Sequence, residues 1–313
     1  MAKVAFIYAG QGAQYTGMGK DLAENYKEAA EVFEAANESI GFDIAKLCFE
    51  GPDEELMKTE NTQPAVLTMS IACLRVLESR GFNPDVAAGL SLGEYSALVN
   101  AGALKFEDAV PLVRLRGRLM QETVPLGKGG MAAIIGLTNE EVLDVCKEAS
   151  QYGIVEPANF NCPGQISIAG EIQALEKAIE IAKSKGAKRA IMLSVSAPFH
   201  CSMLQPAGEK LGEALDKIQF GDLKLPVISN VNAQYIKDKS DIKNLLVRQV
   251  YSSVLWEATI ERMIQDGVDV FVELGPGKVL SGFVRKIDKT RVSLNVEDVK
   301  SLEETLRALE GLK

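Results

Sequence analysis

Between residues 86 and 93 the chain reads Val86-Ala87-Ala88-Gly89-Leu90-Ser91-Leu92-Gly93. Small and β-branched apolar residues of this kind are typical of a buried strand, and here they run directly into a G-x-S-x-G sequence centred on Ser91. Glycines on both sides of a serine let the backbone turn sharply from a strand into a helix, and this turn lifts the hydroxyl clear of the sheet. The stretch therefore predicts a strand, a tight elbow with an accessible serine, and a helix.

The segments on both sides of this elbow alternate between strand and helix patterns. Helical patterns cover 21–40, 65–80, 93–101 and 106–124, and short apolar runs typical of buried strands cover 4–8, 227–230 and 268–273. Strands that alternate with helices favour a mainly parallel sheet covered by helices. We therefore expect an α/β protein with a mainly parallel sheet.

The order of strand and helix patterns changes after the glycine-rich stretch 125–130, which marks the start of a second unit. From there the patterns follow the order strand, helix, strand, strand, helix, strand up to about residue 195. This βαββαβ order is the ferredoxin-like pattern. We predict a ferredoxin-like subdomain over residues 125–196, inserted into a large α/β domain made of residues 1–124 and 197–313.

Composition excludes several classes of function. The 313 residues include 34 Lys and Arg against 43 Asp and Glu, a net charge of −9, which gives no electrostatic reason to bind nucleic acid. The five cysteines are odd in number and form no CxxC pair, so a disulfide framework is not expected. The apolar runs are too short for a signal peptide or a membrane span. We expect a cytoplasmic monomer with no membrane partner.

A base for the serine is identified by counting. A serine hydroxyl is a weak nucleophile at neutral pH unless a neighbouring group takes its proton, and His200 is the one histidine in the chain. It follows the end of the predicted insert, where a cleft between two units would form. The sequence singles out no aspartate to orient the imidazole, so the orienting acceptor could be either a carboxylate or a backbone carbonyl. Cys201, beside the histidine, is interpreted as a buried structural thiol.

Cofactor and metal motifs fail at the residues that matter. A dinucleotide loop would need glycine where Tyr15 stands, and a phosphate-binding loop would need lysine where Met18 stands. A single histidine and scattered cysteines do not suit a metal site. We expect neither a bound cofactor nor a metal.

Three arginines alternate along the predicted helix 106–124, namely Arg114, Arg116 and Arg118. Successive helical residues are about 100° apart, so the three side chains cannot all face water and at least one is expected to point inward. A buried arginine needs a partner such as a carboxylate.

Taken together, these residues resemble the malonyl-CoA:acyl carrier protein transacylases of the acyltransferase family of fatty-acid and polyketide synthesis. The resemblance implies that residues 1–124 and 197–313 form a hydrolase-like α/β catalytic domain that carries the ferredoxin-like insert. The resemblance extends over essentially the whole chain. Five blocks carry it: Gly10-Gln11-Gly12-Ala13-Gln14, Gly89-Leu90-Ser91-Leu92-Gly93-Glu94-Tyr95, Arg116-Gly117, Ala197-Pro198-Phe199-His200 and Val247-Arg248-Gln249-Val250-Tyr251.

The resemblance implies a reaction and a role for each motif residue. Ser91 would carry a malonyl group taken from malonyl-CoA, with coenzyme A as product and acyl carrier protein as acceptor, and His200 would act as base and then acid. The further implied roles are an oxyanion hole from the backbone N–H groups of Gln11 and Leu92, a carboxylate clamp from Arg116, orientation of the histidine by the carbonyl of Gln249, and malonyl selectivity from Phe199.

Two points stay open at this level. Many family members carry histidine where this chain has Leu90, a difference that we interpret as neutral for the reaction. The carrier protein, which is generally acidic in this family, would dock on one of two basic patches. One patch comprises Lys183, Lys185, Lys188 and Arg189, and the other comprises Arg285, Lys286 and Lys289.

Two alternative functions are compatible with the motifs. An esterase or thioesterase would use water as acceptor and would not need Arg116. A non-catalytic subunit that binds the carrier protein would form no acyl-enzyme.

Overall fold

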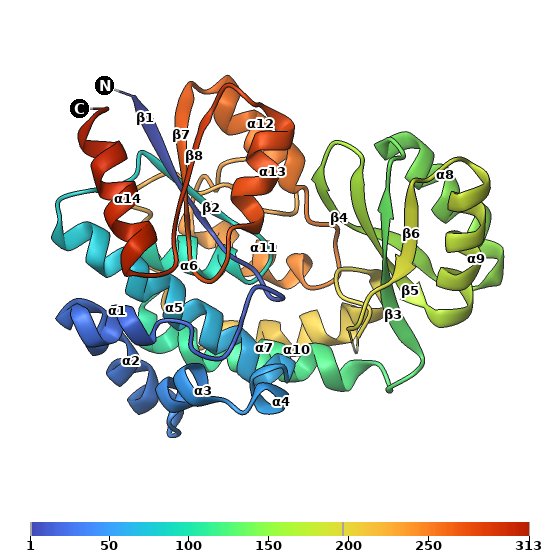
Figure 1. Cartoon of the computed structure of the whole chain (residues 1–313). Helices are drawn as coiled ribbons and strands as arrows, with labels where there is room; N and C mark the ends of the chain where they lie inside the picture. Colours follow the sequence, from blue (N-terminus) through green and yellow to red (C-terminus); the bar gives the residue numbers. More distant parts are fainter. Residues whose placement is uncertain (1, 196, 313) are drawn as a thin grey trace.

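A computed structural model describes residues 2–195 and 197–312; residues 1, 196 and 313, which stand at ends of the predicted segments, lie outside the described residues. The chain forms two four-stranded sheets that lie side by side (Figure 1). One sheet is parallel and belongs to the larger unit, and the other is antiparallel. The predicted α/β class with a mainly parallel sheet is confirmed.

The parallel sheet has the strand order β2-β1-β7-β8. Its strands are β1 (Lys3–Tyr8), β2 (Val86–Gly89), β7 (Val268–Leu274) and β8 (Val292–Val296). In this register Tyr8 lies opposite both Gly89 and Leu274, so three strands end at the same edge. The loops that follow them, including the one that carries Ser91, therefore meet at the carboxyl edge of the sheet, where ligands bind in open α/β folds.

Both faces of the parallel sheet are covered, as the continuous apolar pattern of β1 requires. Phe6 and Tyr8 belong to one core cluster, and Ala5 and Ile7 belong to a second cluster on the opposite face. The first cluster includes residues of α1 (Lys20–Asn25), α2 (Lys27–Ile40), α3 (Ile44–Glu50), α4 (Asp53–Leu56), α5 (Thr59–Ser79), α6 (Gly93–Asn100), α7 (Phe106–Thr123), α10 (Gln205–Leu215), α11 (Lys239–Gln249) and α14 (Val299–Glu310). The second includes residues of α12 (Trp256–Gln265) and α13 (Val279–Ile287).

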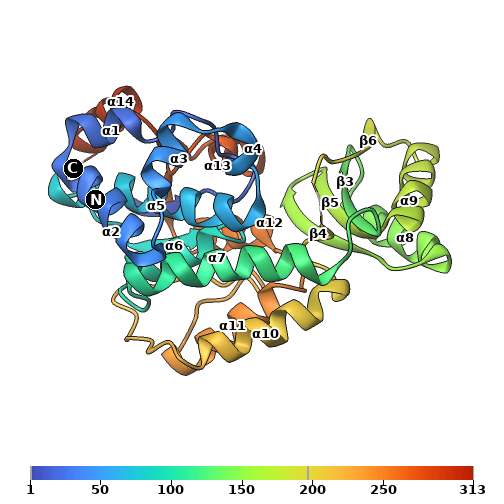
Figure 2. The ribbon, with the colours of Figure 1, turned by 90° about the horizontal axis from the view of Figure 1, so that it is seen from below.

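The second sheet has the order β4-β5-β3-β6, and all of its pairs are antiparallel. Its strands are β3 (Gly129–Ile135), β4 (Val155–Cys162), β5 (Gln165–Glu171) and β6 (Arg189–Met192). Two helices, α8 (Asn139–Ala149) and α9 (Ile172–Ser184), pack on the face turned away from the parallel sheet (Figure 2). The other face of this sheet is turned toward the larger unit.

Backbone contacts join the two units. The N–H of Phe160 in β4 donates to the carbonyl of Val254 at 3.0 Å, and the N–H of Val254 donates to the carbonyl of Ala158 at 2.8 Å. The two segments that lead the chain into and out of the second unit also lie against each other, because a Cβ atom on Gly129 would lie 2.6 Å from the ring of Pro198. The second sheet is thus held beside the carboxyl edge of the first.

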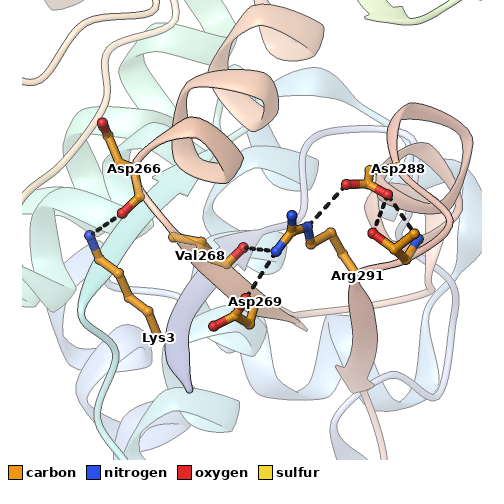
Figure 3. A network of polar contacts seen from close by, with 7 residues as sticks. Lys3, Asp266, Val268, Asp269, Asp288 and Arg291 are labelled. Carbon is orange, nitrogen blue, oxygen red and sulfur yellow. Dashed lines mark hydrogen bonds and ion pairs between the residues drawn. The ribbon is translucent and has the colours of Figure 1, made fainter. Parts of the chain in front are cut away.

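A polar network closes the opposite, amino end of the parallel sheet (Figure 3). The guanidinium of Arg291 donates to Asp269 at 2.9 Å, to the carbonyl of Val268 at 3.3 Å and to Asp288 at 3.0 Å. Hydrogen bonds from Thr290 and then from Arg291 hold the pKa of Asp288 down at about 2. These bonds connect the edge strand β8 to the start of β7, far from the carboxyl edge.

Several elements differ from the sequence prediction, which did not include helices α3, α4, α10, α11, α12, α13 and α14. The helix expected over 21–40 is broken where Tyr26 adopts an extended backbone, with φ −130° and ψ 117°. The helix expected from residue 65 begins earlier, at Thr59, and contains Pro64 in its second turn rather than at its entry. The hydroxyl of Thr62 anchors this early part of the helix by donating to the carbonyl of Leu56 at 2.6 Å. The strand expected over 227–230 forms only isolated bridges, and β8 was not anticipated.

Candidate active site

The elbow at Ser91 is dictated by its glycines. Ser91 itself has a φ of 53°, in the left-handed region. A Cβ atom on Gly89 would lie 1.9 Å from the carbonyl carbon of Gly93, and one on Gly93 would lie 2.2 Å from the carbonyl oxygen of Tyr8. Neither position has room for a side chain, so the G-x-S-x-G spacing is a steric requirement of this turn.

Asn230 holds the elbow from the side. Its Oδ1 accepts from the N–H of Ser91 at 2.6 Å, and its Nδ2 donates to the carbonyl of Gly89 at 2.8 Å. The side chain is fully buried and replaces hydrogen bonds that the sharp turn removes from the backbone. Sequence reasoning missed this residue. An asparagine at the end of an apolar strand pattern, where asparagine is disfavoured, was the available signal.

The structure brings the predicted base to the predicted nucleophile. Nε2 of His200 lies 2.6 Å from Oγ of Ser91, and Nδ1 lies 2.8 Å from the carbonyl oxygen of Gln249. A carbonyl only accepts, so Nδ1 carries the proton and Nε2 is free to accept from the serine. Burial, and then the charge of Arg116, lower the pKa of His200 to about 3. The imidazole is therefore neutral and able to act as a base at neutral pH.

Arg116 points into the same site from α7. Its side chain is 1% exposed. The guanidinium donates to the amide oxygens of Gln63 and Gln249, both at 2.9 Å, and to Oγ of Ser91 at 3.1 Å. It also lies 5.5 Å from the ring centroid of Tyr95. Burial lowers the pKa of Arg116, but an arginine keeps its charge in proteins.

Of the three alternating arginines only this one is buried. Arg114 is half-buried and lies over the ring of Phe42 at 4.6 Å, and Arg118 is exposed. The carboxylate that we expected beside a buried arginine is not among the hydrogen-bond partners that the structure describes for Arg116, which are amide and hydroxyl oxygens. A cation held this way remains available to the carboxylate of a ligand.

The two predicted oxyanion-hole residues lie beside the elbow. Leu92 follows Ser91 directly and stands at the start of α6, where the helix dipole favours negative charge. Gln11 lines the cleft. Its loop packs on the elbow, because a Cβ atom on Gly10 would lie 2.7 Å from the carbonyl oxygen of Leu90.

A cleft of about 950 Å³ opens over these residues between the two sheets. Phe199 and Leu90, predicted to affect selectivity and to be neutral respectively, both line it, together with Ser91, Arg116 and His200. Its wall on the second sheet is formed by Met131, Ala133, Asn159, Asn161, Gln165 and Ser167. The cleft is therefore shaped by the inserted unit as well as by the parallel sheet.

The described ranges 2–195 and 197–312 hold no group of three or more His, Cys, Asp or Glu side chains placed to bind a metal ion. Within the same ranges, none of the helices combines the length and the apolar character that crossing a bilayer requires.

A hydroxyl at a strand-to-helix elbow, hydrogen-bonded to a neutral imidazole in a cleft, is the arrangement of enzymes that act through an acyl-serine. The fold and the site thus define a serine-nucleophile enzyme of the α/β class. The acyl transferase domain family matches residues 5–304, and the chain belongs to this family. The resemblance seen in the sequence motifs is confirmed.

Relatives cover almost the entire chain. A malonyl CoA-acyl carrier protein transacylase of Bacillus subtilis is 48% identical over 310 residues, which are 99% of this chain and 98% of that protein. The crystal structure of the enzyme of the same name from Clostridium perfringens is 52% identical and superimposes with a TM-score of 0.97, covering 99% of this chain and 98% of that one. A malonyl-transacylase in complex with its type II polyketide synthase acyl carrier protein is 45% identical, with a TM-score of 0.96 over 98% of this chain and all of that one.

Proposed function

We propose that this protein transfers a malonyl group from malonyl-CoA to the phosphopantetheine thiol of an acyl carrier protein, and so supplies fatty-acid chain elongation. The observation that carries the proposal is the contact of Ser91 with two different groups, an imidazole at 2.6 Å and a buried guanidinium at 3.1 Å. The first group activates a nucleophile, and the second selects an acyl group that bears a negative charge. The names of the relatives point to the same reaction.

Acylation begins with transfer of the Ser91 proton to Nε2 of His200. Oγ attacks the thioester carbonyl of malonyl-CoA, and the oxygen that becomes negative is stabilised by the backbone N–H groups of Gln11 and Leu92. The carbon–sulfur bond then breaks, and the proton on His200 passes to the departing sulfur of coenzyme A. Each oxyanion donor is expected to contribute about 10² to 10³ in rate.

Deacylation repeats these steps with the carrier protein. His200 accepts the proton of the phosphopantetheine thiol, the sulfur attacks the malonyl ester, and the proton returns to Oγ of Ser91 as the ester bond breaks. The two half-reactions share one base and one oxyanion hole, which is a ping-pong scheme. Malonyl-CoA is the substrate and coenzyme A the product, and we propose no bound cofactor or metal.

Selectivity is assigned to Arg116 and Phe199. A malonyl ester on Ser91 has its free carboxylate two carbons from the ester carbon, within reach of a guanidinium that already touches Oγ. A buried carboxylate without a cation would be strongly disfavoured. Phe199 lines the cleft next to His200, where its ring limits the space for a branched acyl group.

We propose the basic patch on α13 and the loop after it, Arg285, Lys286 and Lys289, as the docking surface for the carrier protein. Nζ of Lys286 donates at 2.8 Å to Oε1 of Gln165, a residue that lines the cleft. In the other patch Lys185 already pairs with Glu148 at 2.5 Å. The patch on α13 is thus beside the cleft that the phosphopantetheine arm must enter.

Further proposals concern the organisation of the chain. The strand order β4-β5-β3-β6 and the βαββαβ sequence of elements support a ferredoxin-like description of the insert and a hydrolase-like description of residues 1–124 and 197–313. We place the insert at 125–196 and propose that the protein acts as a monomer. The five cysteines are free and buried, which fits a cytoplasmic protein.

Intact mass measurement after incubation with malonyl-CoA tests the function. The wild-type chain should gain one malonyl group, and adding acyl carrier protein should move that group to the carrier. Ser91→Ala should gain none. A Ser91→Ala protein that is loaded normally would reject the assigned nucleophile, and malonate released to water in place of loaded carrier would identify a thioesterase. Binding of carrier protein with no acyl-enzyme would identify a non-catalytic subunit.

A further inference from the structure

A buried carboxylate lies directly behind the nucleophile. Glu94, in the first turn of α6, is 0% exposed. Its Oε2 accepts from Nε2 of Gln249 at 2.6 Å and from the N–H of Asn230 at 3.1 Å. Burying a carboxylate is unfavourable unless it is well paired, so a role for this one has to be found in the groups that it binds.

The contact with Glu94 selects one orientation of the Gln249 amide. Nε2 of Gln249 donates to Glu94 and, at 2.9 Å, to the carbonyl of Ser91, while Oε1 accepts from Arg116 at 2.9 Å. If the amide were turned over, its oxygen would face two acceptors and its NH₂ group would face the guanidinium. Both ends would then lose their hydrogen bonds, because a carboxylate cannot donate and an arginine cannot accept.

The same geometry keeps the anion away from the cation. In the described residues Glu94 and Arg116 contact opposite ends of the Gln249 amide, so this amide separates the carboxylate from the guanidinium. A carboxylate bound directly to Arg116 would compete with an acyl carboxylate for the same N–H groups. An amide oxygen holds the guanidinium in place and leaves its charge uncompensated by direct contact.

We propose that Glu94 is a positioning residue for substrate selection: it fixes the Gln249 amide so that its oxygen aims Arg116 at the acyl group on Ser91. The inference rests on the proposed function, since it assumes that an acyl carboxylate meets Arg116. Glu94 touches neither the acyl group nor the base, so its loss acts through Gln249 and Arg116.

Two variants at position 94 separate its hydrogen bonds from its charge. In Glu94→Gln the amide oxygen can occupy the place of Oε2 and accept both hydrogen bonds, and its NH₂ group replaces Oε1, an atom without a hydrogen-bond partner in the described structure. Glu94→Met keeps the length of the side chain and removes the acceptor. The measurement is kcat/KM for malonyl-CoA and for acetyl-CoA, from rates of acyl-enzyme formation.

Glu94→Met should lower kcat/KM for malonyl-CoA by about 30- to 100-fold and that for acetyl-CoA by only a few-fold, the range expected when a hydrogen bond to a charged group is lost. The malonyl-to-acetyl ratio should fall at least about tenfold, whereas Glu94→Gln should keep the ratio within about threefold. Thr305→Val is the control, because Thr305 is a buried polar residue of α14 that does not line the cleft and whose Oγ1 donates to the carbonyl of Asn295 at 2.9 Å. It should lower the melting temperature without changing the ratio.

An unchanged ratio in a folded Glu94→Met protein would overturn the inference, and so would an equal loss of the ratio in Glu94→Gln, which would show that charge is responsible. If Glu94→Met does not fold, Glu94→Asp, whose shorter side chain withdraws the acceptor, is measured with the same outcomes. A wild-type protein with no preference for malonyl-CoA would reject the proposed function instead.

Discussion

The backbone carbonyl oxygen of Gln249 lies 2.8 Å from Nδ1 of His200. This carbonyl occupies the position that a carboxylate has in many serine enzymes, and it fixes the same tautomer of the imidazole. It provides no negative charge to stabilise a protonated imidazole. Burial, and then the cation of Arg116, lower the pKa of His200 and hold its imidazole neutral, with no aspartate charge among its described partners to oppose them.

The pH dependence of acylation should show this electrostatic balance. Protonation of His200 removes the base, and a pKa of about 3 places that loss far below the ordinary value of 6.5. Removing Arg116 removes one of the two main causes of the low pKa, so in Arg116→Ala the acidic limb should move to higher pH. The check is kcat/KM for acetyl-CoA against pH in both proteins. An acidic limb near pH 6.5 in the wild-type protein would contradict the assignment.

Arg116→Ala should reverse the choice of acyl group. Loss of the buried cation should lower kcat/KM for malonyl-CoA by about 10² or more, with a relative gain for acetyl-CoA, because hydrogen bonds to charged groups are worth about 1.5–3 kcal/mol each. Arg118→Ala is the control, since it removes an exposed arginine from the same helix. Equal malonyl-to-acetyl ratios in the two variants would speak against the clamp.

Asn230→Ala should weaken both the fold and the reaction. It leaves the N–H of Ser91 and the carbonyl of Gly89 buried without their partner, which is expected to reduce the free energy of unfolding by about 1–3 kcal/mol per group. Asn232→Ala, two residues away and exposed, should change little. Urea unfolding and the rate of acyl-enzyme formation provide the two measurements. A protein with Asn230→Ala that keeps wild-type stability would show that the elbow does not need this side chain.

Gly89→Ala tests the steric origin of the elbow. The added Cβ would overlap the backbone of Gly93 at 1.9 Å, so we expect loss of at least about 3 kcal/mol of stability, or no folded protein. Gly282→Ala, in α13, adds the same atom where no atom beyond the adjoining backbone of its own helix lies within 4 Å, and it should be neutral or stabilising by up to about 1 kcal/mol. Thermal unfolding distinguishes the two. Similar melting temperatures would contradict the structure of the turn.

Reversing charge at the proposed docking surface should slow only the second half-reaction. Lys286→Glu is expected to lower kcat/KM for the carrier protein several-fold, with an effect that decreases as salt is added, and to leave acylation by malonyl-CoA unchanged. Lys183→Glu, on α9 in the other basic patch, is the comparison. The opposite result, a loss confined to Lys183→Glu, would move the docking surface to that patch.

The sequence was sufficient for the parts of the site that are set by local rules. The elbow follows from two glycines and the candidate base from a single histidine. Helical geometry predicts that at least one of the three alternating arginines points inward, and the family resemblance singles out Arg116. Glu94 and Asn230 could not be found in this way. Glu94 resembles an ordinary exposed helix residue, and only the packing of α6 against the segment around Asn230 and against α11 buries it.

The fold shows the same division between local and long-range information. The order of elements in the insert followed from local periodicity, because each of its strands and helices has a clear pattern. β8 was missed although Val292-Ser293-Leu294-Asn295-Val296 alternates between apolar and polar residues, because five residues at an edge of the sheet give only a short signal. The bridge at Val227 depends on a partner, Ala87, that is 140 residues away.

The left-handed backbone of Ser91 has a consequence for the range of nucleophiles that this scaffold can carry. At a φ of 53° a second substituent on Cβ is severely crowded, so threonine is excluded here although its hydroxyl has similar chemistry. Cysteine has an unbranched Cβ and meets no such barrier. The elbow can therefore accept cysteine as a nucleophile in place of serine, but it cannot accept threonine.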